Sequence, residues 1–249
     1  MSTSYVRLNV KDKIGYIEFY NPPHNGLPAF MLKSLANLIT KAGSDPSIAV
    51  VVLKSGGNRT FCAGASLEEL KVVSNAEEGT AFFQGFANVI NALRCCPKIT
   101  IGRVHGKAVG GGVGLAAATD YCVASCFSEI KLSELTIGIG PFVIEPAVTR
   151  KIGLSAMSQL SLEANKFFSA EWAQQKGLYT NIYSSVEDLD NQVKLLAEQL
   201  CSYNPEALTR LKETFWEGTS DWDKLLKKRA AISGRLVLSD FTNKQLKNY

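Results

Sequence analysis

The first half of the chain alternates short runs of β-branched and aromatic residues with longer amphipathic stretches, and this pattern limits the possible folds. Tyr5–Val10 and Ile14–Tyr20 flank a polar turn and predict a hairpin, and the apolar run Ala49–Ser55 predicts a buried strand. Apolar residues recur at helical spacing over Ala29–Ala42 and Ala76–Leu93. Strands that alternate with helices of this length indicate an α/β fold.

Two more strand-like runs follow, and beyond them the chain becomes helical. Ile99–His105 and Asp120–Ser125 predict strands, and Leu115–Ala118 between them is helix-like. Beyond about Pro141 helical patterns cover Ala147–Ile152, Ser155–Glu163, Ala170–Lys176, Val186–Tyr203, Pro205–Trp216 and Asp221–Ser233. Because no linker rich in Pro, Gly or Ser interrupts the chain, we expect one domain over 1–249, with an α/β core over 1–190 and a helical region over 191–249.

Charge and cysteine usage exclude several classes of function. Lys and Arg exceed Asp and Glu by 27 to 23 without a long run of one sign, so no nucleic-acid partner is expected. The basic excess in the last forty residues fits either a site for a small polyanion or a solvated helix face. Six cysteines without a paired CxxC spacing, and only two histidines, predict neither a metal site nor a disulfide framework.

The amino-terminal residues lack the basic and then apolar layout of a signal peptide. No stretch approaches the roughly 18 apolar residues of a membrane span. We therefore expect no membrane association and a reducing, cytoplasmic location.

Two glycine-containing segments, Phe61–Leu67 and Val109–Leu115, each follow a strand signal and precede a helix signal. Glycine lets a ligand come close to main-chain N–H groups, and a helix start adds unpaired N–H donors with a partial positive charge. Two such segments facing one another would bind an oxyanion. The alternative for a glycine triplet is a tight packing point between a strand and a helix.

The spacing of the residues excludes other interpretations of these motifs. The glycines fit neither G-x-G-x-x-G nor the phosphate loop, where Ala108 stands in place of the required hydroxyl residue. Ser66 and Ser133 do not lie in G-x-S-x-G, and His105 ends a strand, so a nucleophilic triad is not indicated.

Four blocks, in order and with matching spacing, resemble the crotonase (enoyl-CoA hydratase/isomerase) superfamily. They cover 49–70, 99–125, 130–141 and 169–178. The resemblance implies a crotonase-like spiral of β-β-α units with carboxy-terminal helices that assemble a homotrimer or homohexamer. It also implies an acyl-CoA thioester substrate, with coenzyme A as part of the substrate and no separate cofactor.

The same resemblance assigns the chemistry. The backbone N–H groups of Ala65 and Gly111 would donate to the thioester oxygen, and Glu134 would act as acid and base. Apolar neighbours of Glu134 in the sequence, Leu132, Leu135 and Ile137, would raise the pKa of its carboxyl group. A surface position is the alternative for an isolated Glu that follows a strand.

Further substrate contacts follow from the resemblance, which places at the ligand His24, Ala63, Ser66, Leu67, Gly110 and Gly114. His24 lies in a loop similar to the segment along the coenzyme A arm, although a solvated imidazole is the alternative. Gly114 stands where hydratases carry a second glutamate. Glu145 is the candidate to supply that missing carboxyl group, and a solvent-facing Glu145 is the alternative.

A single glutamate favours isomerase-like chemistry, in which one base moves a proton between Cα and Cγ. The alternatives are an enoyl-CoA hydratase, possibly of a branched-chain pathway, an acyl-CoA decarboxylase, and a non-catalytic protein that binds coenzyme A thioesters. Phe215, Trp216, Trp222, Leu225 and Leu226 offer apolar surface for the expected assembly.

Overall fold

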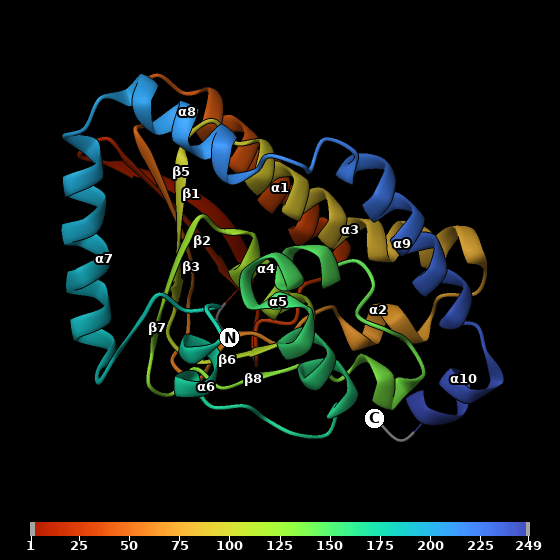
Figure 1. Ribbon diagram of the computed structural model, residues 1–249. Helices are drawn as coiled ribbons and strands as arrows, with labels where there is room; N and C mark the ends of the chain where they lie inside the picture. The colour runs from red at the N-terminus through yellow and green to blue at the C-terminus, as the bar shows by residue number, and fades with distance from the viewer. Residues whose placement is uncertain (1–2, 248–249) are drawn as a thin grey trace.

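The computed structural model describes residues 3–247 and contains two sheets enclosed by helices (Figure 1). The larger sheet has the order β1 (Tyr5–Lys11), β2 (Ile14–Tyr20), β3 (Val50–Ser55), β5 (Ile99–Val104), β7 (Tyr121–Ser125) and β9 (Asn181–Tyr183). It is parallel except for the β1/β2 hairpin. The smaller sheet is parallel, with the order β4 (Thr60–Cys62), β6 (Lys107–Val109) and β8 (Ile130–Lys131).

The helices follow the strands in a regular order. They are α1 (Ala29–Ser44), α2 (Leu67–Lys71), α3 (Ala76–Cys95), α4 (Gly111–Ala118), the 3-10 helix η1 (Glu134–Ile137), α5 (Glu145–Leu162), α6 (Ala170–Gln175), α7 (Val186–Cys201), α8 (Pro205–Phe215), α9 (Trp222–Leu236) and α10 (Asp240–Leu246). From β3 to α5, each turn of chain adds one strand to the larger sheet, the next strand to the smaller sheet, and then helix. This arrangement confirms the expected spiral of β-β-α units.

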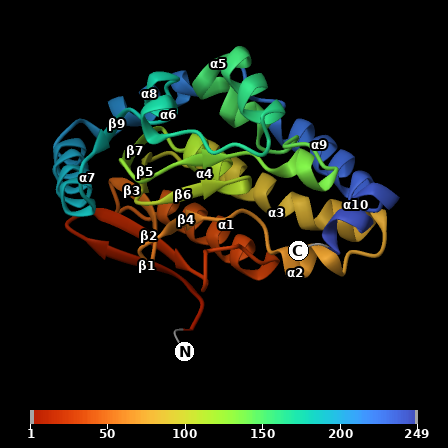
Figure 2. The same ribbon diagram turned by 90° about the horizontal axis from the view of Figure 1, so that it is seen from below.

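The central strands of the larger sheet, β3, β5 and β7, read as apolar runs because both faces of the sheet are covered there. Side chains alternate across β3: Val50 and Val52 pack with α7, whereas Val51 and Leu53 belong to the core formed with α1 and α3. Figure 2 shows α7 on one side of the sheet and α1 and α3 on the other.

The sequence predictions match most of the observed elements. The hairpin, the strands β3, β5 and β7, and the helices α1, α3 and α6 to α9 are confirmed with small shifts at their ends. Helix α4 begins at Gly111 rather than at Leu115, and the two helices predicted over 147–163 form α5, which is interrupted at Gly153 with φ of 76°. The expected division between residues 190 and 191 falls inside α7, where Leu189 and Val193 on either side of it pack in the same cluster.

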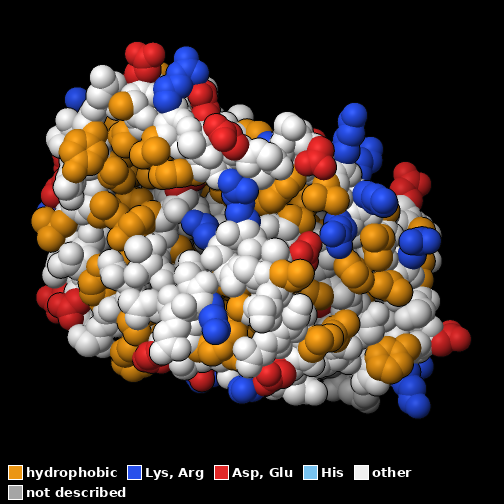
Figure 3. Space-filling view, viewed as in Figure 1, with side chains coloured by type: hydrophobic (Ala, Val, Ile, Leu, Met, Phe, Trp, Pro, Cys, Tyr) orange, Lys and Arg blue, Asp and Glu red, His pale blue; other side chains and the backbone are white. Residues whose placement is uncertain are grey.

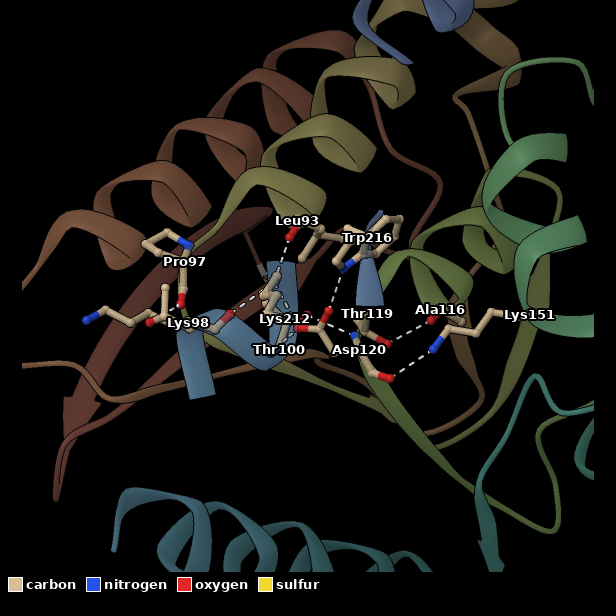
Figure 4. A network of polar contacts seen from close by, with 11 residues as sticks. Leu93, Pro97, Lys98, Thr100, Ala116, Thr119, Asp120, Lys151, Lys212 and Trp216 are labelled. Carbon is tan, nitrogen blue, oxygen red and sulfur yellow. Dashed lines mark hydrogen bonds and ion pairs between the residues drawn. The ribbon is translucent and has the colours of Figure 1, made fainter. Parts of the chain in front are cut away.

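A buried polar network fixes α8 to the sheet (Figure 4). Lys212 Nζ lies 2.8 Å from Asp120 Oδ2, with side chains only 3% and 1% exposed, and also donates to the carbonyls of Leu93 and Lys98. Trp216 Nε1 donates to Asp120 Oδ1 at 2.7 Å. Since both charges are paired and hydrogen-bonded, their burial is tolerated, and the start of the carboxy-terminal region is held in one position.

The following helices fold back over the same chain. Helix α9 runs along α3, and the two meet at Gly79 and Gly234, where a Cβ on Gly79 would lie 2.6 Å from the Gly234 carbonyl oxygen. Only glycine permits this approach. Helix α10 packs against η1, because Phe241 and Thr242 contact the chain at Gly138.

Among residues 3–247, none of the helices combines the length and the apolarity needed to cross a bilayer. On the face seen in Figure 3, Lys and Arg side chains are scattered among acidic and apolar ones.

Candidate functional site

A cavity of about 240 Å³ lies between the two glycine-containing segments, η1, α3 and α9. Its wall is mostly apolar and carries four phenylalanines, Phe82, Phe83, Phe86 and Phe142. Phe82 and Phe83 meet edge to face, with ring centroids 5.1 Å apart. The cavity therefore suits an apolar group.

The first glycine-containing segment turns sharply between β4 and α2. Gly64 has φ of +89°, a conformation that favours glycine. The segment pairs with Leu27, which donates its N–H to Gly64 O at 2.8 Å and accepts from Ser66 N at 3.2 Å. Because these two bonds use the residues on either side of Ala65, the N–H of Ala65 stays outside the pairing.

The second segment begins α4. Gly110, with φ of +53°, precedes the helix, and Gly111 is its first residue, whose N–H has no acceptor one turn earlier. A Cβ on Gly64 would lie 3.5 Å from Gly111 N, so the two segments are in contact. A Cβ on Gly111 would lie 2.2 Å from the Phe86 ring. Both proposed donors therefore belong to one cavity wall, with Phe86 packed against it.

Glu134 opens η1, and its carboxylate lies against Gly110. A Cβ on Gly110 would lie 2.9 Å from Glu134 Oε1, so glycine leaves room for the carboxylate. Oε2 is buried and has no hydrogen-bond partner among residues 3–247. Burial raises the pKa of Glu134 to about 7, although a hydrogen bond with its own backbone opposes the shift. Such a carboxyl group can accept or donate a proton near neutral pH.

The structure brings together most of the site residues that the sequence predicted. Ala65, Gly111 and Glu134 line the cavity, as do Ala63, Leu67 and Gly110. Three predicted residues, Ser66, His24 and Gly114, do not line it. Ser66 Oγ instead accepts the N–H of Glu69 at 3.3 Å and caps α2, and His24 is exposed on its loop.

Gly114, a predicted substrate contact, does not line the cavity, because Ile144 covers it. A Cβ on Gly114 would lie 2.4 Å from Ile144 Cγ2, and Ile144 rather than Gly114 lines the cavity. Glu145 does not replace the missing carboxylate. It accepts from Thr149 Oγ1 at 2.7 Å and pairs with Arg229 at 3.4 Å, away from the cavity.

Sequence reasoning missed several residues of the wall, including Phe86, Ile144 and Ser233. They come from α3, the start of α5, and α9, and no motif in the sequence connects them. Glu134 is the one charged side chain that lines the cavity within residues 3–247. No group of three or more His, Cys, Asp or Glu side chains in that range is arranged to hold a metal ion.

Comparisons with known proteins agree with this architecture. The family model described as enoyl-CoA hydratase/isomerase matches residues 9–247. The peroxisomal Delta(3,5)-Delta(2,4)-dienoyl-CoA isomerase of Arabidopsis thaliana is 27% identical, over 83% of this chain and 78% of the relative. A short-chain-enoyl-CoA hydratase of Clostridium acetobutylicum is 28% identical, over 88% of this chain and 83% of the relative.

The crystal structure of an enoyl-CoA hydratase from Bacillus halodurans superposes with a TM-score of 0.89 over 99% of this chain and 100% of that one. At 23% identity this likeness shows the shared fold. The match of the family model to nearly the whole chain shows more: the protein belongs to the enoyl-CoA hydratase/isomerase family, and so to the crotonase superfamily, as the sequence blocks indicated.

Proposed function

We propose that the protein is an acyl-CoA isomerase that moves a double bond through a thioester enolate, with Glu134 as its single acid and base. One observation carries the proposal. Glu134 is the lone carboxylate that lines the cavity within residues 3–247, its Oε2 is buried without a partner, and it lies against the glycine segment that begins α4.

In the proposed mechanism, a 3-enoyl-CoA places its thioester oxygen at the N–H groups of Ala65 and Gly111. Glu134 removes a proton from Cα, and the electron pair spreads over the dienolate as negative charge develops on the thioester oxygen. The same carboxyl group then returns a proton to Cγ, which yields the 2-enoyl-CoA. Each backbone donor aimed at the oxyanion would stabilise the transition state by about 3–4 kcal/mol.

The residues of the wall weigh against the alternative reactions. Hydration needs a positioned water as well as a proton donor, and Glu145, the candidate second carboxylate, is bonded to Thr149 and Arg229. A decarboxylase would bind the carboxylate of a 2-carboxyacyl-CoA, yet within the described chain no Lys or Arg lines the cavity. A protein that only binds thioesters has no need of a carboxylate with a buried oxygen that lacks a partner.

The test is a set of thioesters of matched chain length offered to the purified protein: 3-enoyl-, 2-enoyl- and 2-carboxyacyl-CoA. We expect conversion of the 3-enoyl to the 2-enoyl compound, with little hydration or loss of CO₂, as measured by mass spectrometry of the products. Hydration that is faster than isomerisation at every chain length would contradict the proposal and favour the hydratase.

We also propose a homotrimer or homohexamer in a cytoplasmic location, as the sequence analysis expects. Of the apolar residues predicted for the contact, Phe215 is 45% exposed and can contribute to it, whereas others cannot. Trp216, Trp222 and Leu226 are buried within their own chain, because the two indoles pack edge to face in the core. Leu154 and Leu162 on α5, 69% and 75% exposed, are better candidates for the contact between subunits. Sedimentation that shows a stable monomer at micromolar concentration would exclude the assembly.

A further inference from the structure

We propose that Ile144, seated over Gly114, determines which reaction the site performs, because it keeps water away from the acyl chain beside Glu134. This inference rests on the proposed function and adds to it the residue that separates isomerisation from hydration. Nothing in the sequence connects the two positions, which lie on α4 and just before α5.

The contact between the two residues is close. Gly114 is fully enclosed on α4, and a Cβ built there would lie 2.4 Å from Ile144 Cγ2 and 2.7 Å from Ile144 Cβ. Ile144 is 4% exposed and lines the cavity. It therefore occupies the space through which any side chain at position 114 would enter the cavity.

The residues around Ile144 make this part of the wall apolar. Pro141, Phe142 and Val143 precede it along the cavity lining. The next residue, Glu145, directs its carboxylate to Thr149 and Arg229 instead of to the cavity. The chain thus turns an aliphatic side chain inward and its neighbouring acid outward at the start of α5.

An ordered water in a protein interior usually makes about three hydrogen bonds. Gly114 offers no side chain, and Ile144 offers only carbon atoms, so at this wall a water molecule finds no polar side chain to hold it. The polar side chains of the lining, Ser133, Glu134, Thr136 and Ser233, lie at η1 and on α9, so none of them belongs to this part of the wall. The wall favours an apolar acyl chain in the same space.

This difference separates the two reactions. Hydration of a 2-enoyl-CoA forms a bond from the water oxygen to Cβ and places a proton on Cα. Isomerisation transfers a proton from Cα to Glu134 and then to Cγ, and consumes no water. A wall that excludes water suppresses the first reaction without obstructing the second.

The experiment compares three variants: Ile144→Ala, Gly114→Glu and the double variant. Ile144→Ala opens space for water in the cavity that Glu134 lines, and we expect at least about a tenfold rise in the ratio of hydration to isomerisation. The double variant adds a carboxylate to that space, and the ratio should rise by about 10²-fold or more, within the range of general acid–base help. Gly114→Glu alone meets Ile144 and should lower the melting temperature with no gain in hydration.

Ile152→Ala is the matched control, because it makes the same change on α5 at a buried position that does not line the cavity. It should lower the melting temperature and leave the ratio unchanged. A folded Ile144→Ala protein that isomerises with an unchanged ratio would overturn the inference, while the proposed function would stand. A wild-type protein without isomerase activity would instead refute the proposed function.

Discussion

Glu134→Gln is expected to lower isomerase turnover by about 10²–10⁴-fold, the usual contribution of a positioned acid or base, while the affinity for acyl-CoA stays nearly unchanged. The amide group of glutamine has nearly the size of the carboxyl group of glutamate and fits the same space against Gly110. It cannot, however, accept the proton from Cα. Turnover of a 3-enoyl-CoA and calorimetric binding of a saturated acyl-CoA measure the two effects separately. A variant with near-normal turnover would remove Glu134 from the mechanism.

The pH dependence gives a second signature of the same group. Because the ionised carboxylate is the base and burial raises its pKa to about 7, wild-type kcat/KM should rise with pH through about 7. The residual activity of Glu134→Gln should not show this rise. If kcat/KM rose through pH 7 in Glu134→Gln as it does in the wild type, the titrating group would be another residue.

The thermal stability of this variant checks that its fold is intact. A carboxyl group whose pKa is raised from 4.5 to about 7 on folding keeps its stability contribution below pH 4.5 and loses it as pH rises through 7. Between the unfolded pKa of 4.5 and the folded pKa of about 7, the free energy of unfolding falls by about 1.4 kcal/mol for each pH unit. The total loss above pH 7 is therefore about 3 kcal/mol. Glu134→Gln lacks this loss, so its melting temperature should exceed that of the wild type at pH 8.

Gly111→Pro should lower turnover by about 10²–10³-fold relative to Gly111→Ala, when both are made in a Phe86→Ala background. A Cβ on Gly111 would strike the Phe86 ring at 2.2 Å, and the background removes that contact. Alanine then keeps the backbone N–H and proline deletes it, whereas both add a Cβ at the first position of α4. The pair thus removes the Cβ contact from the comparison, and proline then differs from alanine in losing the N–H and in the ring carbons that replace it.

Circular dichroism and melting temperatures must first show that both proteins are folded. A folded proline variant as active as its alanine partner would show that the N–H of Gly111 does not hold the thioester oxygen.

The central strands β3, β5 and β7 of the larger sheet were predictable because they are buried on both faces and therefore read as apolar runs, as in Ala49–Ser55. The three-residue edge strand β9 was not predicted, and neither was the smaller sheet. Its strands β4, β6 and β8 have two or three residues each, too few to show a period, and they follow the predicted runs closely. The strand-like runs that the sequence shows before the two glycine-containing segments are therefore β3 and β5 of the larger sheet. The strands that lead directly into these segments are β4 and β6 of the smaller sheet.

A raised pKa for Glu134 was predicted from its apolar neighbours in the sequence, of which Leu132 is buried and Leu135 is 42% exposed. The contact of the carboxylate with Gly110, far away in the sequence, was not predicted. The contact of Ile144 with Gly114 likewise depends on how α5 packs on α4. Contacts of this kind arise only when distant segments meet, so the spacing of residues along the chain does not show them.

The most direct test of the central claim is exchange of the α-protons of saturated acyl-CoAs in deuterium oxide, because it requires enolate formation and no later step. Butyryl-, hexanoyl- and octanoyl-CoA would be incubated with the wild type, Glu134→Gln, and the proline and alanine variants of Gly111, and deuterium at Cα followed by mass spectrometry. The account predicts exchange with the wild type for at least one chain length, and its loss in Glu134→Gln and in Gly111→Pro. Exchange that persists in Glu134→Gln, or is absent from the wild type with every thioester, would contradict it.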